Sequence, residues 1–239
     1  MEPTILYEDS DILAINKPSG LVVHSDGKTP EPNLVDWLLM KYPEMKNVGE
    51  PGKDSHGNEV LRSGIVHRLD RGTSGVMLVA KTQEAFEHLK KQFQAHEIRK
   101  TYHAFVFGEV KQDEGTIDRP IGRSSKDFRQ WSAQRGARGE MRPAVTDYKV
   151  LIRGGGYSYI EAHPKTGRTH QIRVHFKAIN YPLVGDALYS SNKENALGFA
   201  RLALHSSEIV FKDMQATEHA VSAPLPEDFI KARSVLQSL

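Results

Sequence analysis

The sequence predicts an α+β protein built on a mixed sheet. Short runs of apolar and β-branched residues, bounded by Gly, Pro, Asp and Asn, outnumber the segments with helical periodicity. The two kinds of segment do not alternate regularly, which disfavours a doubly wound parallel sheet. The 239 residues suit one large domain or two small ones, and no stretch reads as a linker. We therefore expect a single domain over residues 1–239.

Composition excludes several classes of protein. Hydrophobic residues make up 38% and charged residues 26% of the chain, as in an ordinary soluble globular protein. No apolar run approaches the roughly 18 residues that span a bilayer. The chain has no cysteine, which excludes disulfides, Cys-ligated zinc and thiol nucleophiles. It begins with the acidic MEPT and shows no signal-peptide pattern, so we expect a cytoplasmic protein without membrane association.

In the first part of the chain, each element has a local signal. Two short strands are predicted over residues 5–8 and 12–17, around a DSD turn, and a third apolar run follows at 21–24. Asn33 is the expected N-cap of a helix that reaches Met40. The Gly-, Pro- and Asp-rich residues 46–62 predict a long loop. After an apolar strand over 76–81, Thr82 is the expected N-cap of a helix that ends near residue 95.

The second part is richer in strands. Strands are predicted over residues 99–108, 144–152 and 157–162, the last two joined by the glycines at 154–156. Thr169 is the expected cap of a helix that carries Ile172 and Phe176 on its apolar stripe. Two strand segments follow at 203–205 and 208–211, and a terminal helix is expected from Pro226 onwards.

Positive charge is unevenly distributed, although the net charge is only +2. Residues 118–142 hold seven Lys or Arg against three acids, and residues 163–177 hold four against none. We expect the 118–142 segment to be an extended loop or a small hairpin, in which Phe128 and Trp131 stand among arginines. Such aromatic rings stack on exposed bases, although Trp131 could instead fold onto the core. A basic face of this kind suits a polyanion, and a merely solvated face is the alternative.

Asp70 is the strongest candidate for chemistry. It lies in the loop IVHRLDRGTSG (65–75), between Arg68 and Arg71 and before an apolar strand. Nearby guanidinium groups favour the ionised carboxylate, which acts as an acceptor or a nucleophile. The alternative is a solvated loop aspartate. A second candidate is Arg168, which follows Gly167 at a helix start and could pair with a carboxylate in bidentate geometry. Arg173 on that helix could contact phosphates.

Several other site types are not supported. The chain lacks a GK[ST] phosphate loop, a dinucleotide fingerprint and a G-x-S-x-G elbow. His170 and His175 are five residues apart, so they do not form an i,i+4 metal pair, and no metal is expected. A glycosidase needs two cooperating carboxylates, whereas the polar motifs offer Asp70 alone.

Three motifs in order resemble the signature of the RluA-type pseudouridine synthases. They are HRLD with TSG (67–75), RKTYHA (99–104) and GRTHQIRVH (167–175), flanked by NKPSGLVVH (16–24) and PLVGD (182–186). The resemblance covers residues from about 5 to 226. It implies a largely antiparallel sheet in two halves with flanking helices and a central active-site cleft. It also implies isomerisation of uridine to pseudouridine in ribosomal or transfer RNA, without metal or organic cofactor.

The resemblance also assigns roles to residues. Asp70 is the catalytic aspartate, Tyr102 stacks on the target base and Arg168 pairs with the aspartate. The expected substrate-binding residues are Ile172 at the base pocket, together with Arg68 and Arg173. Many relatives carry an extra N-terminal RNA-binding domain, which we do not expect here, and we expect a monomer.

The chemistry leaves two routes open. The enzyme must break the N1–C1′ bond, turn the uracil and join its C5 to C1′. Asp70 could attack C1′, or it could remove the C2′ proton to give a glycal, and both roles need the ionised form. A non-catalytic RNA-binding protein or RNA chaperone is the alternative of another class. The complete set of Asp70, Tyr102 and Arg168 disfavours it, because binding alone does not need that combination.

Overall fold

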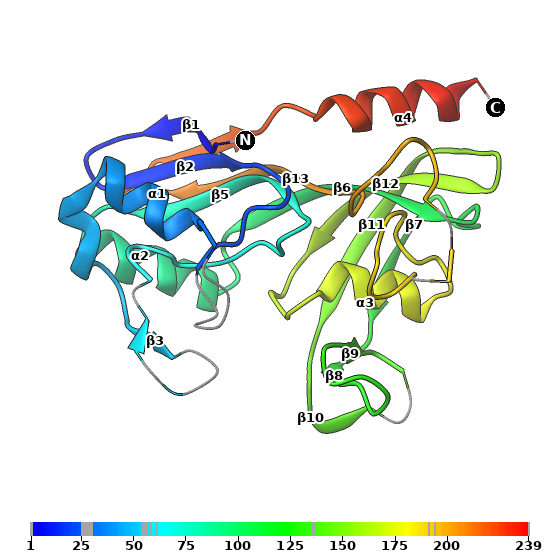
Figure 1. Cartoon of the computed structure of the whole chain (residues 1–239), viewed down its shortest axis with the longest axis horizontal. Helices are drawn as coiled ribbons and strands as arrows, with labels where there is room; N and C mark the ends of the chain where they lie inside the picture. The colour runs from blue at the N-terminus through cyan, green and yellow to red at the C-terminus, as the bar shows by residue number, and fades with distance from the viewer. Residues whose placement is uncertain are drawn as a thin grey trace. The chain divides into compact units, whose positions relative to one another are not determined.

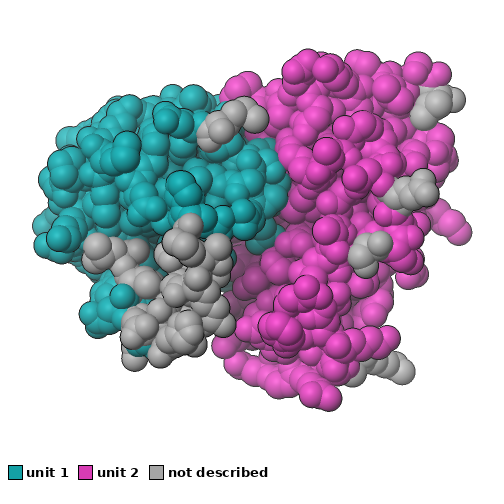
Figure 2. Space-filling model, in the orientation of Figure 1, with its two compact units in different colours: residues 1–99, 208–223 teal, residues 100–207, 224–239 magenta. Residues whose placement is uncertain are grey.

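The structure is a computed structural model that describes residues 2–24, 31–53, 57, 59–60, 62–134, 137–190, 192–193 and 195–238. The chain forms two compact units, which Figure 2 colours teal and magenta. Unit 1 comprises Met1–Arg99 and Glu208–Ala223, and unit 2 comprises Lys100–Ser207 and Pro224–Leu239. Each unit is thus built from two separate stretches of chain. That residues 1–239 act as one domain stays a prediction.

Unit 1 is organised around a sheet. Its strands are β1 (Thr4–Glu8), β2 (Ile12–Lys17), β5 (Ser74–Ala80), β13 (Leu204–Lys212) and β14 (Glu218–Ser222), paired in that order. Residues 204–207 of β13 belong to unit 2 and the rest to unit 1. All seven residues of β5 are buried, and Val76 and Leu78 pack with Ile12 in the core. The continuous apolar run of β5 is therefore the centre of the unit.

Helices of unit 1 begin where their capping residues predict. The helix α1 (Leu34–Lys41) has Asn33 as its N-cap, and Asn33 and Asp36 form a reciprocal capping box. The helix α2 (Gln83–Gln94) begins after Thr82, whose hydroxyl accepts the N–H of Ala85. Phe86 and Leu89 of α2 pack in the core with the buried strands. Both predicted caps are confirmed, because each depends on residues only three positions apart.

The long loop that the sequence predicts after α1 contains short regular elements. They are the 3₁₀-helix η1 (Pro43–Asn47) and the two-residue strands β3 (Gly52–Lys53) and β4 (Glu59–Val60). Residues 54–56, 58 and 61 of this loop lie outside the described residues.

Unit 2 has its own four antiparallel strands. They are β6 (Arg99–Phe107), β12 (Tyr157–Pro164), β11 (Val145–Gly154) and β7 (Glu114–Asp118), in that order. The helix α4 (Glu227–Gln237) buries Phe229, which meets Phe105 of β6 edge to face. The helix α3 (Gln171–Ala178) buries Phe176 against Tyr148 of β11. Figure 1 shows both helices beside these strands. The α+β class and the largely antiparallel sheet are confirmed.

The basic segment 118–142 forms a small sheet of its own in unit 2. Its strands are β10 (Arg138–Arg142), β8 (Ile121–Arg123) and β9 (Trp131–Ser132), in that order. Trp131 is half-buried against a cluster that contains Ile121, Val174 and Tyr189, as the core alternative for this ring predicted. Arg135, in the same segment, lies outside the described residues.

Two local predictions are corrected. Thr169 is exposed, and the N-cap of α3 is instead His170, with a left-handed backbone at φ 56° and no side-chain cap. The two strand segments expected at 203–205 and 208–211 are one continuous strand, β13. In the apolar run 21–24, Val22 forms an isolated bridge with Asn33. The sequence did not predict strand β14, because its polar and apolar residues alternate too weakly to indicate a strand.

Candidate active site

Asp70 lies in a turn that leads into the buried strand β5. Its carbonyl accepts the N–H of Thr73 at 3.1 Å, which closes the turn. Thr73 is buried, and Gly75 has φ 113°, a conformation that favours glycine. The TSG triplet thus connects the Asp70 turn to the centre of unit 1, as the sequence predicted. Asp70 itself is half-buried.

The residues after β2 hold the Asp70 turn by its main chain. Lys17 at the end of β2 is 0% exposed, and its ammonium donates to the carbonyls of Pro18 at 2.9 Å and Leu21 at 2.8 Å. It also reaches the carbonyl of Arg71 at 3.4 Å. A buried ammonium is tolerated when acceptors surround it, so Lys17 fixes the two segments together. The sequence showed NKPSG only as a flanking motif and gave Lys17 no role.

Two further bonds join the same segments. The N–H of Gly20 donates to the Arg71 carbonyl at 2.8 Å, and the hydroxyl of Ser19 donates to the Gly72 carbonyl at 2.8 Å. The backbone that presents Asp70 is therefore anchored through the carbonyls of Arg71 and Gly72, the two residues that follow Asp70. Such anchoring preorganises a reactive side chain, because the turn does not have to be ordered when substrate binds.

The charged neighbours of Asp70 in sequence have partners of their own. The Arg71 guanidinium donates to both carboxylate oxygens of Glu31, at 2.7 and 3.2 Å. The exposed Arg68 lies 3.2 Å from the ring nitrogen Nε2 of His24. His67 has a structural role, because its Nε2 accepts the N–H of Leu78 at 2.8 Å. A contact of Arg68 with the substrate stays a prediction.

Tyr102 lies on β6 of unit 2, opposite Ala162 of β12, and is buried. Lys100 precedes it by two residues, so the two side chains share one face of the strand. Burial lowers the pKa of Lys100 to about 8. Its ammonium is 3.5 Å from the carbonyl of Thr166, in the loop that leads to Arg168. The second motif thus contacts the residue that directly precedes the third motif.

A buried glutamine shapes the loop that carries Arg168. The Oε1 atom of Gln171 accepts the N–H of Arg168 at 3.0 Å and the hydroxyl of Thr166 at 2.6 Å. Its Nε2 donates to Val145 and Thr146 of β11, each at 3.0 Å. The side chain of Arg168 donates through Nε to the carbonyl of Pro143 at 3.0 Å. The loop is therefore held at the start of β11, and Gln171 is a residue whose role sequence reasoning missed.

Arg173 is buried, contrary to the solvent-facing position expected for a phosphate contact. Its side chain is 10% exposed and that of Asp186 is 0% exposed. Its Nε and one terminal nitrogen donate to the two oxygens of Asp186, at 2.7 and 2.8 Å. This bidentate geometry is the strong form of an ion pair. Ile172, next to Arg173, is also buried.

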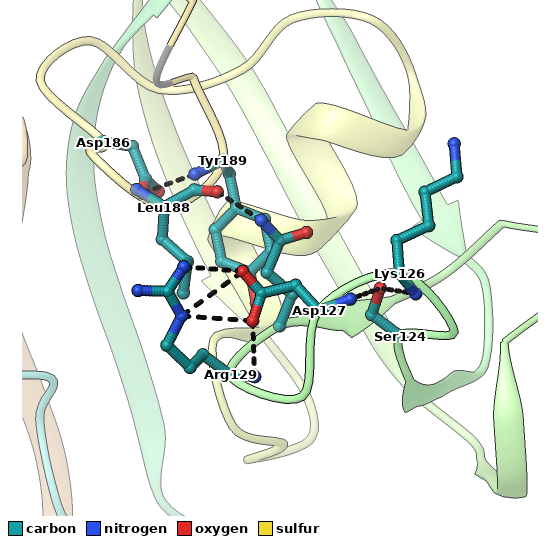
Figure 3. A network of polar contacts seen from close by, with 8 residues as sticks. Ser124, Lys126, Asp127, Arg129, Asp186, Leu188 and Tyr189 are labelled. Atoms are coloured by element: carbon teal, nitrogen blue, oxygen red, sulfur yellow. Dashed lines mark hydrogen bonds and ion pairs between the residues drawn. The ribbon is translucent and has the colours of Figure 1, made fainter.

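Tyr189 connects the start of α3 to the small sheet. Its hydroxyl accepts the N–H of Trp131 on β9 at 2.9 Å and lies 2.8 Å from Nδ1 of His170. The Asp186 carboxylate also accepts the N–H groups of Leu188 and Tyr189, at 3.0 and 3.1 Å. The PLVGD flank thus leads into the polar network of Asp186, Leu188 and Tyr189 (Figure 3). Tyr189 extends this network to His170, which directly precedes α3.

Among the described residues, no group of three or more His, Asp or Glu is placed to hold a metal ion.

His175 is buried in α3, and its two ring nitrogens lie 2.9 Å from the Thr146 hydroxyl and the Arg119 carbonyl. Burial lowers the pKa of His175, so this histidine is neutral and structural.

The described helices include none with the length and apolarity that crossing a membrane requires. Cytoplasmic location and a monomeric state stay predictions.

Comparisons with known proteins agree with the family that the sequence motifs resemble. The family model described as RNA pseudouridylate synthase matches residues 11–178, which include Asp70, Tyr102 and Arg168. An uncharacterised RNA pseudouridine synthase of Bacillus subtilis is 39% identical over 95% of this chain and 71% of its own length. The ribosomal large subunit pseudouridine synthase D of Pseudomonas aeruginosa is 38% identical over 99% of this chain and 72% of its own length.

Solved structures of the same kind share the fold. Human RNA pseudouridylate synthase domain containing 4 superposes with a TM-score of 0.74 and 25% identity, over 98% of this chain and 92% of its own. Human RNA pseudouridylate synthase domain containing 1 gives 0.73 and 27%, over 94% and 84%. With the motifs, the fold and the relatives in agreement, this chain belongs to the RNA pseudouridine synthase family, whose members isomerise uridine in RNA to pseudouridine.

Proposed function

We propose that this enzyme modifies a uridine of ribosomal RNA and that Asp70 is the group that acts on the ribose. The observation that carries the proposal is the anchored Asp70 turn. Its main chain accepts hydrogen bonds from Lys17, Gly20 and Thr73. A carboxylate on such a fixed turn is positioned for reaction before the substrate arrives.

The other site residues complete the reaction. Arg168 pairs with the Asp70 carboxylate and orients it, and Tyr102 stacks on the extruded uracil. Ile172 supplies an apolar wall that retains the detached base while it turns. Base extrusion costs a few kcal/mol, and stacking on an aromatic ring offsets roughly 1–3 kcal/mol of that cost. Atoms balance without a co-reactant, because the N1–C1′ bond breaks, the C5–C1′ bond forms and the proton leaves C5 for N1.

Arg173 has a different role in this proposal from the one the sequence suggested. Two of its N–H groups are committed to Asp186, and its guanidinium lies 4.9 Å from the ring centre of Tyr189. It therefore supports the start of α3, whereas Arg68, which is exposed, is the better candidate for an RNA contact.

Ribosomal RNA is the proposed substrate because several relatives carry that name. The proteins of Pseudomonas aeruginosa and Yersinia pestis, 38% and 37% identical, are both called ribosomal large subunit pseudouridine synthase D. Transfer RNA is the alternative within the same chemistry. Incubation of the purified protein with each RNA, followed by pseudouridine mapping, separates the two.

The Asp70→Asn variant tests the catalytic assignment. It keeps the shape of the side chain and removes its charge, so we expect no pseudouridine and an RNA affinity within about twofold of wild type. The matched control is Asp113→Asn, because the Asp113 side chain of unit 2 is 86% exposed and the change removes only a surface ion pair with Arg153. Product formation by Asp70→Asn would overturn the assignment. RNA binding without product in the wild type would favour the non-catalytic alternative.

The Arg168→Ala variant tests the pairing role. We expect turnover to fall far more than RNA affinity, because Arg168 acts on the carboxylate and not on a phosphate. In the Asp70→Asn background, which should form no product, the same change should leave RNA affinity within about twofold, since the charge that Arg168 serves is gone. An equal loss of turnover and affinity would show that Arg168 is a phosphate contact instead.

A further inference from the structure

The loop between β8 and β9 exposes an aromatic ring. Phe128 is 85% exposed, more than any other large apolar side chain of the described residues. The neighbouring aromatic residue of this segment, Trp131, is half-buried and packs with the core. A single exposed apolar side chain is ordinary on a protein surface, so the case for a partner rests on how this turn is held and on the charge around it.

The turn that carries Phe128 is fixed from both sides (Figure 3). The Asp127 carboxylate accepts the backbone N–H of Arg129 at 2.9 Å and a terminal N–H of its guanidinium at 2.7 Å. The hydroxyl of Ser124 accepts the N–H groups of Lys126 and Asp127, at 3.2 and 3.4 Å. Because the residues before and after Phe128 are both held, the backbone sets the direction of its Cα–Cβ bond and keeps the side chain on the solvent side of the turn.

The same turn is attached to the rest of unit 2. Gln130 donates its side-chain N–H to the carbonyl of Leu188 at 2.7 Å, beside Tyr189 and Asp186 (Figure 3). A terminal nitrogen of Arg123 donates to the carbonyl of Phe128 at 3.2 Å, and its guanidinium stacks 4.2 Å from the ring centre of Trp131. The turn that carries Phe128 is therefore attached to residues that pack in the core of unit 2.

Charge around the ring favours a polyanion. Arg129 is neutralised by Asp127, whereas Arg123 and Lys126 are exposed cations for which no acidic partner is seen among the described residues. The hydrogen bonds from Arg129 lower the pKa of Asp127 to about 2, so the Asp127–Arg129 pair persists at any physiological pH. A fixed aromatic face between two cations suits a base with its flanking phosphates.

We propose that the segment 123–130 is a preformed platform on which Phe128 stacks with an unpaired base of the RNA substrate. This inference rests on the proposed function, because it takes the RNA substrate as the occupant. Arg123 and Lys126 contact the phosphates beside that base. A rigid platform binds with little loss of chain entropy, which favours RNA loops and ends in which bases are already unstacked.

The test compares Phe128→Ala with Phe128→Trp, using a ribosomal RNA fragment that the wild type modifies and measuring its dissociation constant. We expect Phe128→Ala to weaken binding about tenfold or more and Phe128→Trp to stay within about threefold of wild type, because any aromatic face serves. The matched control is Met40→Ala, since Met40 of α1 is 83% exposed. This control should bind as the wild type does.

The outcomes separate this inference from the proposed function. Wild-type affinity in Phe128→Ala, while the wild type still forms pseudouridine, would overturn the platform alone. An equal loss in Phe128→Ala and Phe128→Trp would also overturn it, since stacking would then not be the interaction. A loss confined to Phe128→Ala would support the platform, even if Asp70→Asn proved active and the catalytic assignment failed.

Discussion

The hydroxyl of Tyr189 lies 2.8 Å from Nδ1 of His170, the residue at which the backbone turns left-handed before α3. A left-handed conformation is unfavourable for a residue other than glycine, so it persists only where surrounding contacts hold it. Tyr189 supplies such a contact, and the same hydroxyl accepts the N–H of Trp131. The path of the chain from Arg168 into α3 therefore depends on a residue far along the sequence.

The first prediction follows from this relationship. Tyr189→Phe keeps the ring and removes the hydroxyl, so the Arg168 loop should lose its alignment. We expect turnover to fall about 10- to 100-fold, with RNA affinity within about twofold of wild type. Single-turnover kinetics with a binding titration measures both. Tyr148→Phe is the control, because that buried ring also packs on α3, through Phe176. Unchanged turnover in Tyr189→Phe would contradict the prediction.

The second prediction concerns the buried pair of Arg173 and Asp186. Arg173→Ala leaves the Asp186 carboxylate buried without its cation, and we expect the free energy of unfolding to fall by about 3–5 kcal/mol. Urea unfolding measures this. A phosphate contact behaves differently, because its loss lowers the salt dependence of RNA binding and leaves stability intact. Wild-type stability in Arg173→Ala would therefore restore the original interpretation of Arg173 as a substrate contact.

The third prediction concerns Lys17. Lys17→Met is of similar length but leaves the carbonyls of Pro18, Leu21 and Arg71 without their shared donor. We expect a loss on the order of 3 kcal/mol in the free energy of unfolding and a large fall in turnover. Lys46→Met serves as the control, because Lys46 is exposed. If Lys17→Met unfolded at the same urea concentration as this control, the anchoring of the Asp70 turn would be refuted.

The fourth prediction is a pH dependence set by Asp9. Burial acts to raise the pKa of its carboxyl, but hydrogen bonds from the Tyr7 hydroxyl and from the N–H groups of Asp11 and Ile12 lower it below 3.8. A lowered pKa in the folded state means that the unfolded state binds the proton more readily. The stabilisation by Asp9 is therefore complete above about pH 4 and is lost as the pH falls through the folded-state pKa.

Urea unfolding between pH 2 and pH 7 tests this assignment. Asp9→Asn should be less stable than wild type at neutral pH, and the difference should narrow as the pH falls. Asp113→Asn, which removes only a surface ion pair with Arg153, should stay within about 1 kcal/mol of the wild-type curve. A constant gap between Asp9→Asn and wild type across the whole range would exclude the ionisation of Asp9 as the cause.

Local signals predicted much of this fold. The Asn33 and Thr82 caps and the glycine turn at 154–156 each depend on residues within a few positions, and each is confirmed. The cap of α3 was wrongly assigned to Thr169, because the true cap at His170 is held by Tyr189, nineteen residues away. A short-range pattern contains no information about such a partner.

In the candidate site, too, local motifs were predicted from the sequence, whereas contacts with distant segments were not. The motifs located Asp70, Tyr102 and Arg168, and the family is confirmed. Periodicity placed Arg173 on α3 but did not reveal that Asp186 buries its charge. Lys17 and Gln171 were missed for the same reason, since their importance lies in acceptors that belong to other segments. The roles of the catalytic residues stay predictions for the experiments above.

The discontinuous composition of the two units has a consequence for synthesis on the ribosome. Unit 1 needs Glu208–Ala223, which supply most of β13 and all of β14, and unit 2 needs the α4 segment that follows. Proteins emerge from the ribosome N-terminus first, and contiguous domains fold in that order. Here neither unit has its full set of strands and helices until the last part of the chain has been translated. The nascent chain therefore exposes unfinished sheet edges for most of its synthesis, when chaperones are best placed to protect them.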